Sequence, residues 1–324
     1  MRGNRFFTVA LAISASVILL LSAARVISDT EKPRFRVSVV VDESGSGRWL
    51  PFREGITQAA KDNNIELSFV TTDALVSVQQ EGRIIAREIQ SGADGVIAGF
   101  RSSSGTAEML RGFMGQTLLE LVDTEVESEG TNDSIGLVSA DNAAIGQALC
   151  RMLLSDLPEG AAAKRLGLLC GRQQQFSVQE RLSTFSEELK TGIVDKRWEI
   201  PDIEDGKEAL ARKCAEAPVD ILVAMDNASM ECAMEYLEEN GKRNILLYGV
   251  GNSEKLVYGL DSGLIRGMIV PEEFSMGYHA LSDLAARLNH RISVPFRREI
   301  GFRAVRRDTM YLEENQKILF PRIA

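Results

Sequence analysis

Five residues that follow predicted strands or open a predicted helix have side chains suited to binding a polyhydroxylated small molecule. They are Trp49, Asp123, Arg181, Asp226 and Asn252. Charged side chains can hydrogen-bond a sugar through two atoms at once, while an indole face covers the apolar side of its ring. These residue types therefore predict a ligand-binding site.

The glycines after the first strand do not form a nucleotide-binding loop. Gly45 and Gly47 are present, but Leu50 stands where a dinucleotide fingerprint needs a third glycine, and Trp49 would obstruct a pyrophosphate. The sequence contains neither a P-loop pattern nor a G-x-S-x-G nucleophile elbow. We therefore expect no catalytic residue and no cofactor.

The cysteines and histidines do not form a metal-binding pattern. The two histidines, His279 and His290, are too far apart for a helical ligand pair, and they leave general-base chemistry to carboxylates. The four cysteines lie in apolar contexts without a CxxC motif, at Cys150, Cys170, Cys214 and Cys232. We expect no metal site and interpret the cysteines as buried free thiols, although pairing in an exported chain stays open.

The first of the five residues lies in the segment FRVSVVVDESGSGRWLPFREG, residues 35–55. Its run of β-branched residues predicts a buried parallel strand, and Pro51 suits the first turn of a helix. Ligands of open α/β sheets bind outside the carboxyl ends of the strands, so we expect the loop between strand and helix to contact a ligand. Arg48 in this loop and Arg101 in a later one are interpreted as solvated surface.

Strand and helix patterns alternate along the rest of the chain in two similar series. The predicted strands are 65–70, 94–100, 118–123, 134–139, 165–170, 197–200, 220–225, 244–249, 265–270 and 309–312. We expect Asp141 to cap one helix and the sequence SVQE, residues 177–180, to form a capping box on another. Such alternation predicts parallel sheets with right-handed crossovers, and these strands are too many for one ordinary sheet.

The predicted fold is therefore an α/β fold of two similar Rossmann-like lobes joined by a three-strand hinge. We assign residues 34–139 and 271–293 to the N-terminal lobe, and residues 140–270 and 294–324 to the C-terminal lobe. The three crossings between the lobes are expected near residues 139–141, 270–273 and 292–295.

The order of elements over residues 35–312 resembles the type I periplasmic binding proteins, the ribose- and galactose-binding group whose fold also forms the effector domain of LacI-type repressors. The resemblance rests on the strand, polar loop and aromatic in VVVDESGSGRWLPFREG, and on Ser139-Ala140-Asp141-Asn142, where the family has S-D-N. It rests also on Arg181, four residues before Phe185.

The resemblance implies roles for four residues. Trp49 matches the stacking aromatic, Asp123 the carboxylate that ends the last strand of the first lobe, Arg181 the guanidinium of a second-lobe helix, and Asp226 the polar residue after DILVAM. The chain departs from the sugar binders in having no second aromatic near Ile203, and at three other positions: Thr124 for arginine, Gly251 for the aspartate of the G-F-D turn, and Pro271 for glutamine or asparagine.

Each of the five residues also has a purely structural interpretation. Trp49 could cover the core under its helix, Asp123 could cap a turn, and Arg181 could pair with a glutamate of its own helix. Asp226 could cap the next helix, and Asn252 follows a glycine, which is ordinary turn chemistry.

The N-terminal 29 residues predict export. Arg2 and Arg5 precede the uncharged apolar segment 6–24, which fits both a cleaved signal peptide and a membrane anchor. The positive-inside rule keeps the arginines cytoplasmic and places the rest of the chain in the periplasm or on the outer face of the cell membrane.

Charge and the resemblance together indicate the partners. The 37 basic and 46 acidic residues give a net charge of -9, which argues against a nucleic-acid partner. The resemblance implies an extracytoplasmic solute-binding protein that closes on a small polar ligand, a sugar or sugar-like compound, for uptake by an ABC permease. A role as the ligand-sensing partner of a membrane sensor kinase is the alternative, and an enzyme on the same fold is less favoured.

Overall fold

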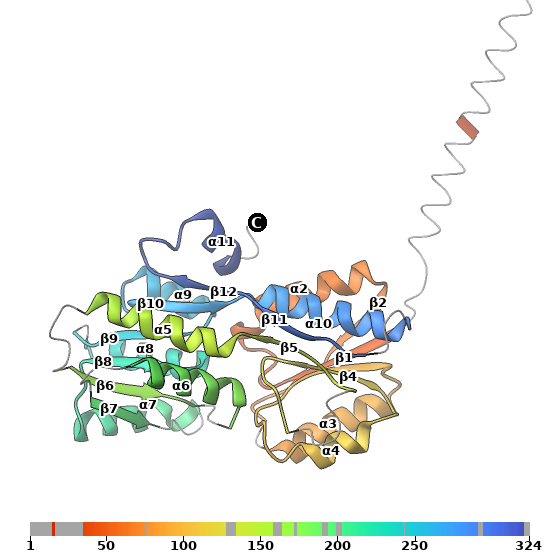
Figure 1. Cartoon of the computed structure of the whole chain (residues 1–324), viewed down its shortest axis with the longest axis horizontal. Coiled ribbons are helices and arrows are strands. Elements are labelled where there is room, and N and C mark those ends of the chain that lie inside the picture. The colour runs from red at the N-terminus through yellow and green to blue at the C-terminus, as the bar shows by residue number, and fades with distance from the viewer. Residues whose placement is uncertain are drawn as a thin grey trace, which may run out of the picture.

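The chain forms two α/β lobes that lie side by side in a computed structural model (Figure 1). The structure describes residues 15–16, 35–75, 77–127, 134–157, 164–171, 174–189, 194–198, 203–242, 244–290 and 294–320. Each lobe contains a six-stranded sheet, with strand orders β11-β5-β4-β3-β1-β2 and β12-β10-β9-β8-β6-β7. Only β10 and β12 pair antiparallel among the pairings of the described residues. The predicted α/β fold of two similar lobes is confirmed.

The first lobe, on the right in Figure 1, is built mainly from the N-terminal part of the chain and completed by two later elements. Its elements are β1 (Phe35–Val41), the 3-10 turn η1 (Gly47–Trp49), α2 (Leu50–Asp62), β2 (Ile65–Phe69), α3 (Val78–Gln90), β3 (Gly95–Gly99), α4 (Ala107–Phe113), β4 (Leu118–Val122), β5 (Gly136–Ala140), α10 (Glu273–Leu288) and β11 (Arg297–Ile300). The β-branched run of β1 lies between β2 and β3, where both faces of the sheet are covered.

The second lobe repeats this arrangement. Its elements are α5 (Asn142–Asp156), β6 (Arg165–Leu169), α6 (Phe176–Glu188), β7 (Val194–Trp198), α7 (Ile203–Glu216), β8 (Ile221–Ala224), α8 (Asn227–Glu239), β9 (Leu246–Val250), α9 (Glu254–Asp261), β10 (Gly267–Pro271), β12 (Phe302–Val305) and α11 (Glu313–Leu319). As predicted, Asp141 caps α5, accepting a hydrogen bond from the backbone N–H of Ala144 at 2.8 Å.

Close helix contacts at glycines fix two elements that carry site residues. A Cβ on Gly277 of α10 would lie 2.2 Å from the carbonyl oxygen of Phe52, so glycine lets α10 pack directly on α2. A Cβ on Gly146 of α5 would lie 2.4 Å from the carbonyl oxygen of Arg181. Because real side chains cannot approach so closely, these glycines set the position of α10, which begins at Glu273, and of α6, which carries Arg181.

The chain crosses between the lobes three times, and the third crossing differs from the prediction. The first two crossings follow β5 and β10, as expected. The third lies at Gly301, between β11 and β12, instead of near residues 292–295. Arg297 of β11 pairs with Leu137 of β5, so β11 belongs to the first sheet although residues from 294 onward were assigned to the second lobe.

Two local predictions are wrong. Residues 309–312 form turns before α11 and not a terminal strand. The sequence 177–180 lies within α6, whose N-cap is Gln175 and makes no side-chain capping hydrogen bond. The spacing of a serine and a glutamate was present, but the helix begins before the serine.

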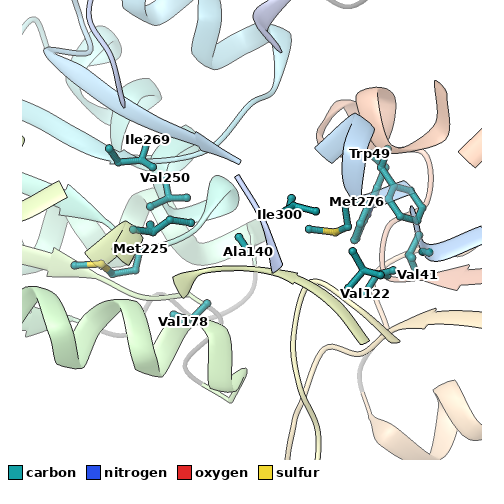
Figure 2. Close-up of a cluster of buried hydrophobic side chains, with 14 of the residues drawn as sticks. Val41, Trp49, Val122, Ala140, Val178, Met225, Val250, Ile269, Met276 and Ile300 are labelled. Atoms are coloured by element: carbon teal, nitrogen blue, oxygen red, sulfur yellow. The ribbon is translucent and has the colours of Figure 1, made fainter. Parts of the chain in front are cut away.

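One hydrophobic cluster includes residues of both lobes (Figure 2). Val41, Val122 and Met276 lie on the side of the first lobe, and Val250 and Ile269 lie on the side of the second. Ala140 and Ile300, from the hinge strands β5 and β11, lie between the two groups. Hydrophobic side chains at the strand ends of the two sheets therefore form one continuous cluster at the hinge.

The predicted signal or anchor segment, residues 6–24, lies outside the described residues except for 15–16. Among the described helices, none combines the length and the apolar character that a membrane crossing requires. The cysteines at 150, 170, 214 and 232 are free thiols, and Cys232 alone of the four is partly exposed.

Candidate functional site

All five predicted site residues are buried at the interface between the lobes. Asp123 directly follows β4, and Asp226 directly follows β8. Asn252 comes shortly after β9, Trp49 ends the turn η1 after β1, and Arg181 lies on α6. The carboxyl ends of both sheets thus supply the side chains, as expected for open α/β sheets.

Arg181 extends from the second lobe toward the first. Its Nε donates to Oδ1 of Asn142 at 2.7 Å, and its Nη1 donates to the carbonyl oxygen of Met225 at 3.1 Å. Its Nη2 lies 3.9 Å from Oδ1 of Asp123 across the interface. Burial lowers the pKa of Arg181, and Asp123 counteracts this shift. The alternative that Arg181 pairs with a glutamate of its own helix is therefore wrong.

Asp123 presents its carboxylate between two arginines. Its backbone adopts φ 72°, a left-handed conformation that is uncommon for a residue other than glycine. The carboxylate forms an ion pair with Arg48 of its own lobe and lies near Arg181 of the other. A backbone conformation outside the common regions at a ligand-facing strand end is consistent with a functional position.

Arg48 is the residue that sequence reasoning missed. It was interpreted as solvated, yet its side chain is only 12% exposed and pairs with Asp123 and, at 3.9 Å, with Oε1 of Glu273. Its guanidinium carbon lies 4.4 Å from the ring centroid of Trp49. Burial lowers the pKa of Arg48, but Asp123 and Glu273 raise it more, so the group stays charged. Glu273 follows the predicted strand 265–270 in the sequence, and this carboxylate was the signal that could have indicated a partner for Arg48.

Trp49 covers the core, as its structural interpretation predicts. The indole belongs to the hydrophobic cluster of Figure 2 and contacts Phe52 edge to face, with ring centroids 5.3 Å apart. Its Nε1 donates to the carbonyl oxygen of Asp42 at 2.8 Å, which fixes the ring. A ring held in this way keeps one face toward the interface, where Arg48 stacks on it.

Asp226 and Asn252 have structural partners as well as a place at the interface. Oδ1 of Asp226 caps α8 by accepting a hydrogen bond from the backbone N–H of Ser229 at 2.9 Å. Nδ2 of Asn252 donates to the carbonyl oxygen of Arg48 at 3.2 Å, which joins the two lobes. Oδ1 of Asn252 is buried and has no hydrogen-bond partner within the described part of the chain.

Glu273 is a second carboxyl group that the sequence analysis did not include. It lies in the first turn of α10 and is buried. Burial raises its pKa to about 7, although Arg48 lowers it. Oε2 of Glu273 has no partner among the described residues. The site therefore contains two buried acceptor atoms, on Glu273 and Asn252, that are available to a hydrogen-bond donor.

The lobes contact each other directly beside these residues. Nε2 of Gln175 donates to the carbonyl oxygen of Phe100 at 2.7 Å, and the backbone N–H of Ser177 donates to Oγ1 of Thr124 at 3.1 Å. Thr124, a departure from the family pattern, thus serves as a contact between the lobes. A cavity of about 140 Å³ remains between Arg48 and Trp49 on one side and residues of α8 on the other. This cavity is smaller than a typical ligand pocket of about 300–1,000 Å³, and its lining does not include Asp123, Arg181, Asp226 or Asn252.

The arrangement suits binding better than metal chemistry. Within the described ranges, no group of three or more histidine, cysteine or carboxylate side chains is placed to hold a metal ion. The groups present are guanidinium, carboxyl, amide and indole groups, and they come from both lobes.

Comparison with known proteins agrees with this geometry. A family model described as periplasmic binding protein domain matches residues 37–291. A search of curated proteins finds no match.

Solved structures share the two-lobed fold at low sequence identity. A solute-binding protein of an ABC transporter from Agrobacterium vitis, bound to α-D-tagatopyranose, has a TM-score of 0.80 and 16% identity over 88% of this chain and 99% of its own. A carbohydrate-transporter solute-binding protein from Agrobacterium radiobacter, in complex with D-arabinose, has a TM-score of 0.78 and 14% identity over 88% and 98%. The periplasmic component of a sugar transport system from Hahella chejuensis has a TM-score of 0.76 and 20% identity over 84% and 99%.

Proposed function

The chain belongs to the periplasmic binding protein family, and from this premise we propose that it is an extracytoplasmic solute-binding protein whose lobes close on a sugar or a sugar-like ligand. The resemblance inferred from the sequence is thereby confirmed at the level of the family. One observation carries the proposal: Asp123 and Arg181, from different lobes, face each other at 3.9 Å. A ligand held between such groups would link the lobes and favour the closed state.

The ligand would be held by the five predicted residues. Asp123, Arg181, Asp226 and Asn252 would hydrogen-bond its hydroxyl groups, and the fixed face of Trp49 would cover its apolar side. Related structures contain D-arabinose, α-D-tagatopyranose and D-fucose, which supports a monosaccharide as the ligand class.

The partner would be a membrane protein. An ABC permease that receives the ligand is the main candidate, because the similar structures belong to ABC transport systems. A membrane sensor kinase is the second candidate, since residues 6–24 could keep the protein on the outer face of the membrane if they are not cleaved. We assign the protein no catalytic reaction.

A thermal-shift screen against D-arabinose, D-tagatose and D-fucose tests the proposal. A ligand at 100 times its dissociation constant should stabilise the protein by about 2.7 kcal/mol. Ligand recovered chemically unchanged after incubation would separate binding from an enzymatic role. The sugar assignment would be overturned if no monosaccharide, whether a pentose, a hexose or a deoxy sugar, raised the melting temperature.

A further inference from the structure

The Arg48 side chain makes the contacts that the site would offer to a sugar ring. Its flat guanidinium stacks on Trp49 at 4.4 Å, forms an ion pair with Asp123, and lies 3.9 Å from Oε1 of Glu273. Stacking on an aromatic face combined with hydrogen bonds to carboxylates at the ring edge is how a polyhydroxylated ligand would be held there.

The same residue joins the two lobes. Its carbonyl oxygen accepts a hydrogen bond from Nδ2 of Asn252, which belongs to the second lobe. The carboxylate of Asp123, which Arg48 holds from one side, faces Arg181 of the second lobe on the other. The residues at the centre of the closed interface are therefore connected through Arg48.

We propose that Arg48 is an internal occupant of the ligand site, and that a ligand reaches the subsite over Trp49 only by displacing its guanidinium. Without a ligand, the Arg48 guanidinium would fill this subsite of the first lobe, while its backbone carbonyl oxygen accepts the hydrogen bond from Asn252 of the second lobe. This proposal rests on the proposed function only in naming a sugar as the displacing ligand, because the guanidinium subsite itself is defined by Trp49, Asp123 and Glu273.

The charges of the subsite determine which ligands can replace Arg48. After its displacement, Asp123, Glu273 and Asp226 would face a single buried arginine, Arg181. The buried atoms Oδ1 of Asn252 and Oε2 of Glu273 also need donors and have no partner among the described residues. The displacing ligand is therefore rich in hydrogen-bond donors and is neutral or positively charged, such as a hexose or an amino sugar; sugar acids and sugar phosphates are excluded.

Chemical rescue of Arg48→Ala in the full chain tests the occupancy. Ethylguanidinium at millimolar concentration should raise the melting temperature of this variant, because it refills the space over Trp49. It should leave the unsubstituted protein unchanged, since Arg48 already fills the subsite. A folded Arg48→Ala variant that ethylguanidinium does not stabilise would overturn the proposal.

Arg53→Ala is the matched control. Arg53 also stacks on an aromatic ring, with its guanidinium carbon 4.9 Å from the centroid of Phe69, but it is exposed and pairs with no carboxylate among the residues that the structure describes. Ethylguanidinium should not stabilise this variant. If Arg48→Ala alone does not fold, Arg48→Ala combined with Glu273→Gln removes one buried charge and keeps Trp49 and Asp123, and the same rescue is expected.

A comparison of sugars tests the ligand class and separates the two proposals. D-galactosamine should bind the unsubstituted protein at least as tightly as D-galactose, and D-galacturonate should bind least; the reverse order would overturn the stated class. Rescue by ethylguanidinium without binding of any sugar would preserve the occupancy and remove the sugar assignment. Sugar binding without rescue would preserve the sugar assignment and overturn the proposal that Arg48 occupies the subsite.

Discussion

The first lobe contains two buried arginine–carboxylate clusters that differ in what satisfies the guanidinium. In the lobe core, Arg287 of α10 pairs with Glu120 of β4 at 3.3 Å and also donates to the carbonyl oxygens of Leu119 and Ser134 at 2.8 and 2.6 Å. At the lobe interface, the recorded contacts of the Arg48 guanidinium are with side chains: Asp123, Glu273 and Trp49.

This difference separates a structural cluster from one that can be rearranged. Backbone carbonyls of a sheet and its adjoining loop hold Arg287 in one place, and its side chain is only 5% exposed. The partners of Arg48 lie on loops and a helix end at the interface, where opening of the lobes would admit water. Arginine and glutamate can therefore stabilise the fold in the lobe core and form a rearrangeable site at the lobe interface.

Arg287→Ala should produce the largest effect. Above about pH 8, where the buried Glu120 is ionised, the substitution would leave this carboxylate without its cation, and breaking a buried pair in this way costs about 3–5 kcal/mol. Urea denaturation measures the loss as a lower transition midpoint. Lys317→Ala, which removes an exposed pair on α11, is the control and should change stability by less than about 0.5 kcal/mol. Equal losses of stability in Arg287→Ala and Lys317→Ala would contradict the description of Arg287 as a structural residue of the lobe core.

Arg181→Ala should abolish ligand-dependent stabilisation while the lobe cores stay folded. The about 2.7 kcal/mol expected from ligand at 100 times its dissociation constant would be lost, because the second lobe would no longer reach Asp123. Thermal shift with D-tagatose measures the effect, and Arg53→Ala, an exposed arginine of α2, should keep the full shift. A full shift in Arg181→Ala would place the ligand away from this interface.

The pH dependence of stability should distinguish the carboxyl groups of the two clusters. Burial raises the pKa of Glu120 to about 8 and that of Glu273 to about 7, from 4.5. The folded state then keeps these protons longer than the unfolded chain, so stability is fully present below pH 4.5 and is lost as the pH rises through the folded pKa. Glu120→Gln should flatten the decline up to about pH 8, and Glu273→Gln only up to about pH 7.

Urea denaturation at several pH values measures these profiles. A profile of Glu273→Gln that matches the unsubstituted protein throughout would mean that Glu273 is hydrated in solution, as it would be if the lobes were open. An unchanged profile of Glu120→Gln would contradict the description of Glu120 as a buried group.

Most of the fold was predictable because it depends on local patterns. The β-branched run of β1 and the capping aspartate of α5 specify their elements within a few residues, and alternation of strands and helices implies two parallel sheets. The strand β11 was not predicted as part of the first sheet, because its sequence RREI is polar and it pairs with β5 alone. Its place depends on tertiary contacts that no local pattern records.

The candidate site was predictable in its strand-end residues and not in its centre. The place of Asp123 follows from the rule that strand ends meet the ligand, whereas Arg181, on α6, follows from the family resemblance. Arg48 was interpreted as solvated because charged residues in polar loops usually are. Its burial depends on Glu273, which arrives by a later crossing of the chain, and on Trp49, whose ring is fixed by a hydrogen bond to the backbone.

Thr124→Val should have the smallest effect and would sharpen the comparison at the interface itself. The substitution keeps the volume of the side chain but removes Oγ1, which accepts the hydrogen bond from the backbone N–H of Ser177 in the other lobe. Losing the bond to Ser177 costs about 0.5–1.5 kcal/mol, and this part of the cost falls on the closed state because the bond exists only when the lobes are closed. Oγ1 also hydrogen-bonds Ser103 and Glu125 of its own lobe, and the loss of those bonds affects the open and closed states alike.

Solution scattering should therefore give a larger radius of gyration for ligand-free Thr124→Val than for the unsubstituted protein. Thr117→Val is the matched control, because Oγ1 of Thr117 donates to the carbonyl oxygen of Ala93 within the first lobe. It should leave the radius unchanged. A radius that is unaffected by Thr124→Val would mean that the other contacts across the interface, such as the ion pair of Asp123 with Arg181 and the hydrogen bond from Gln175 to Phe100, hold the lobes closed without this one.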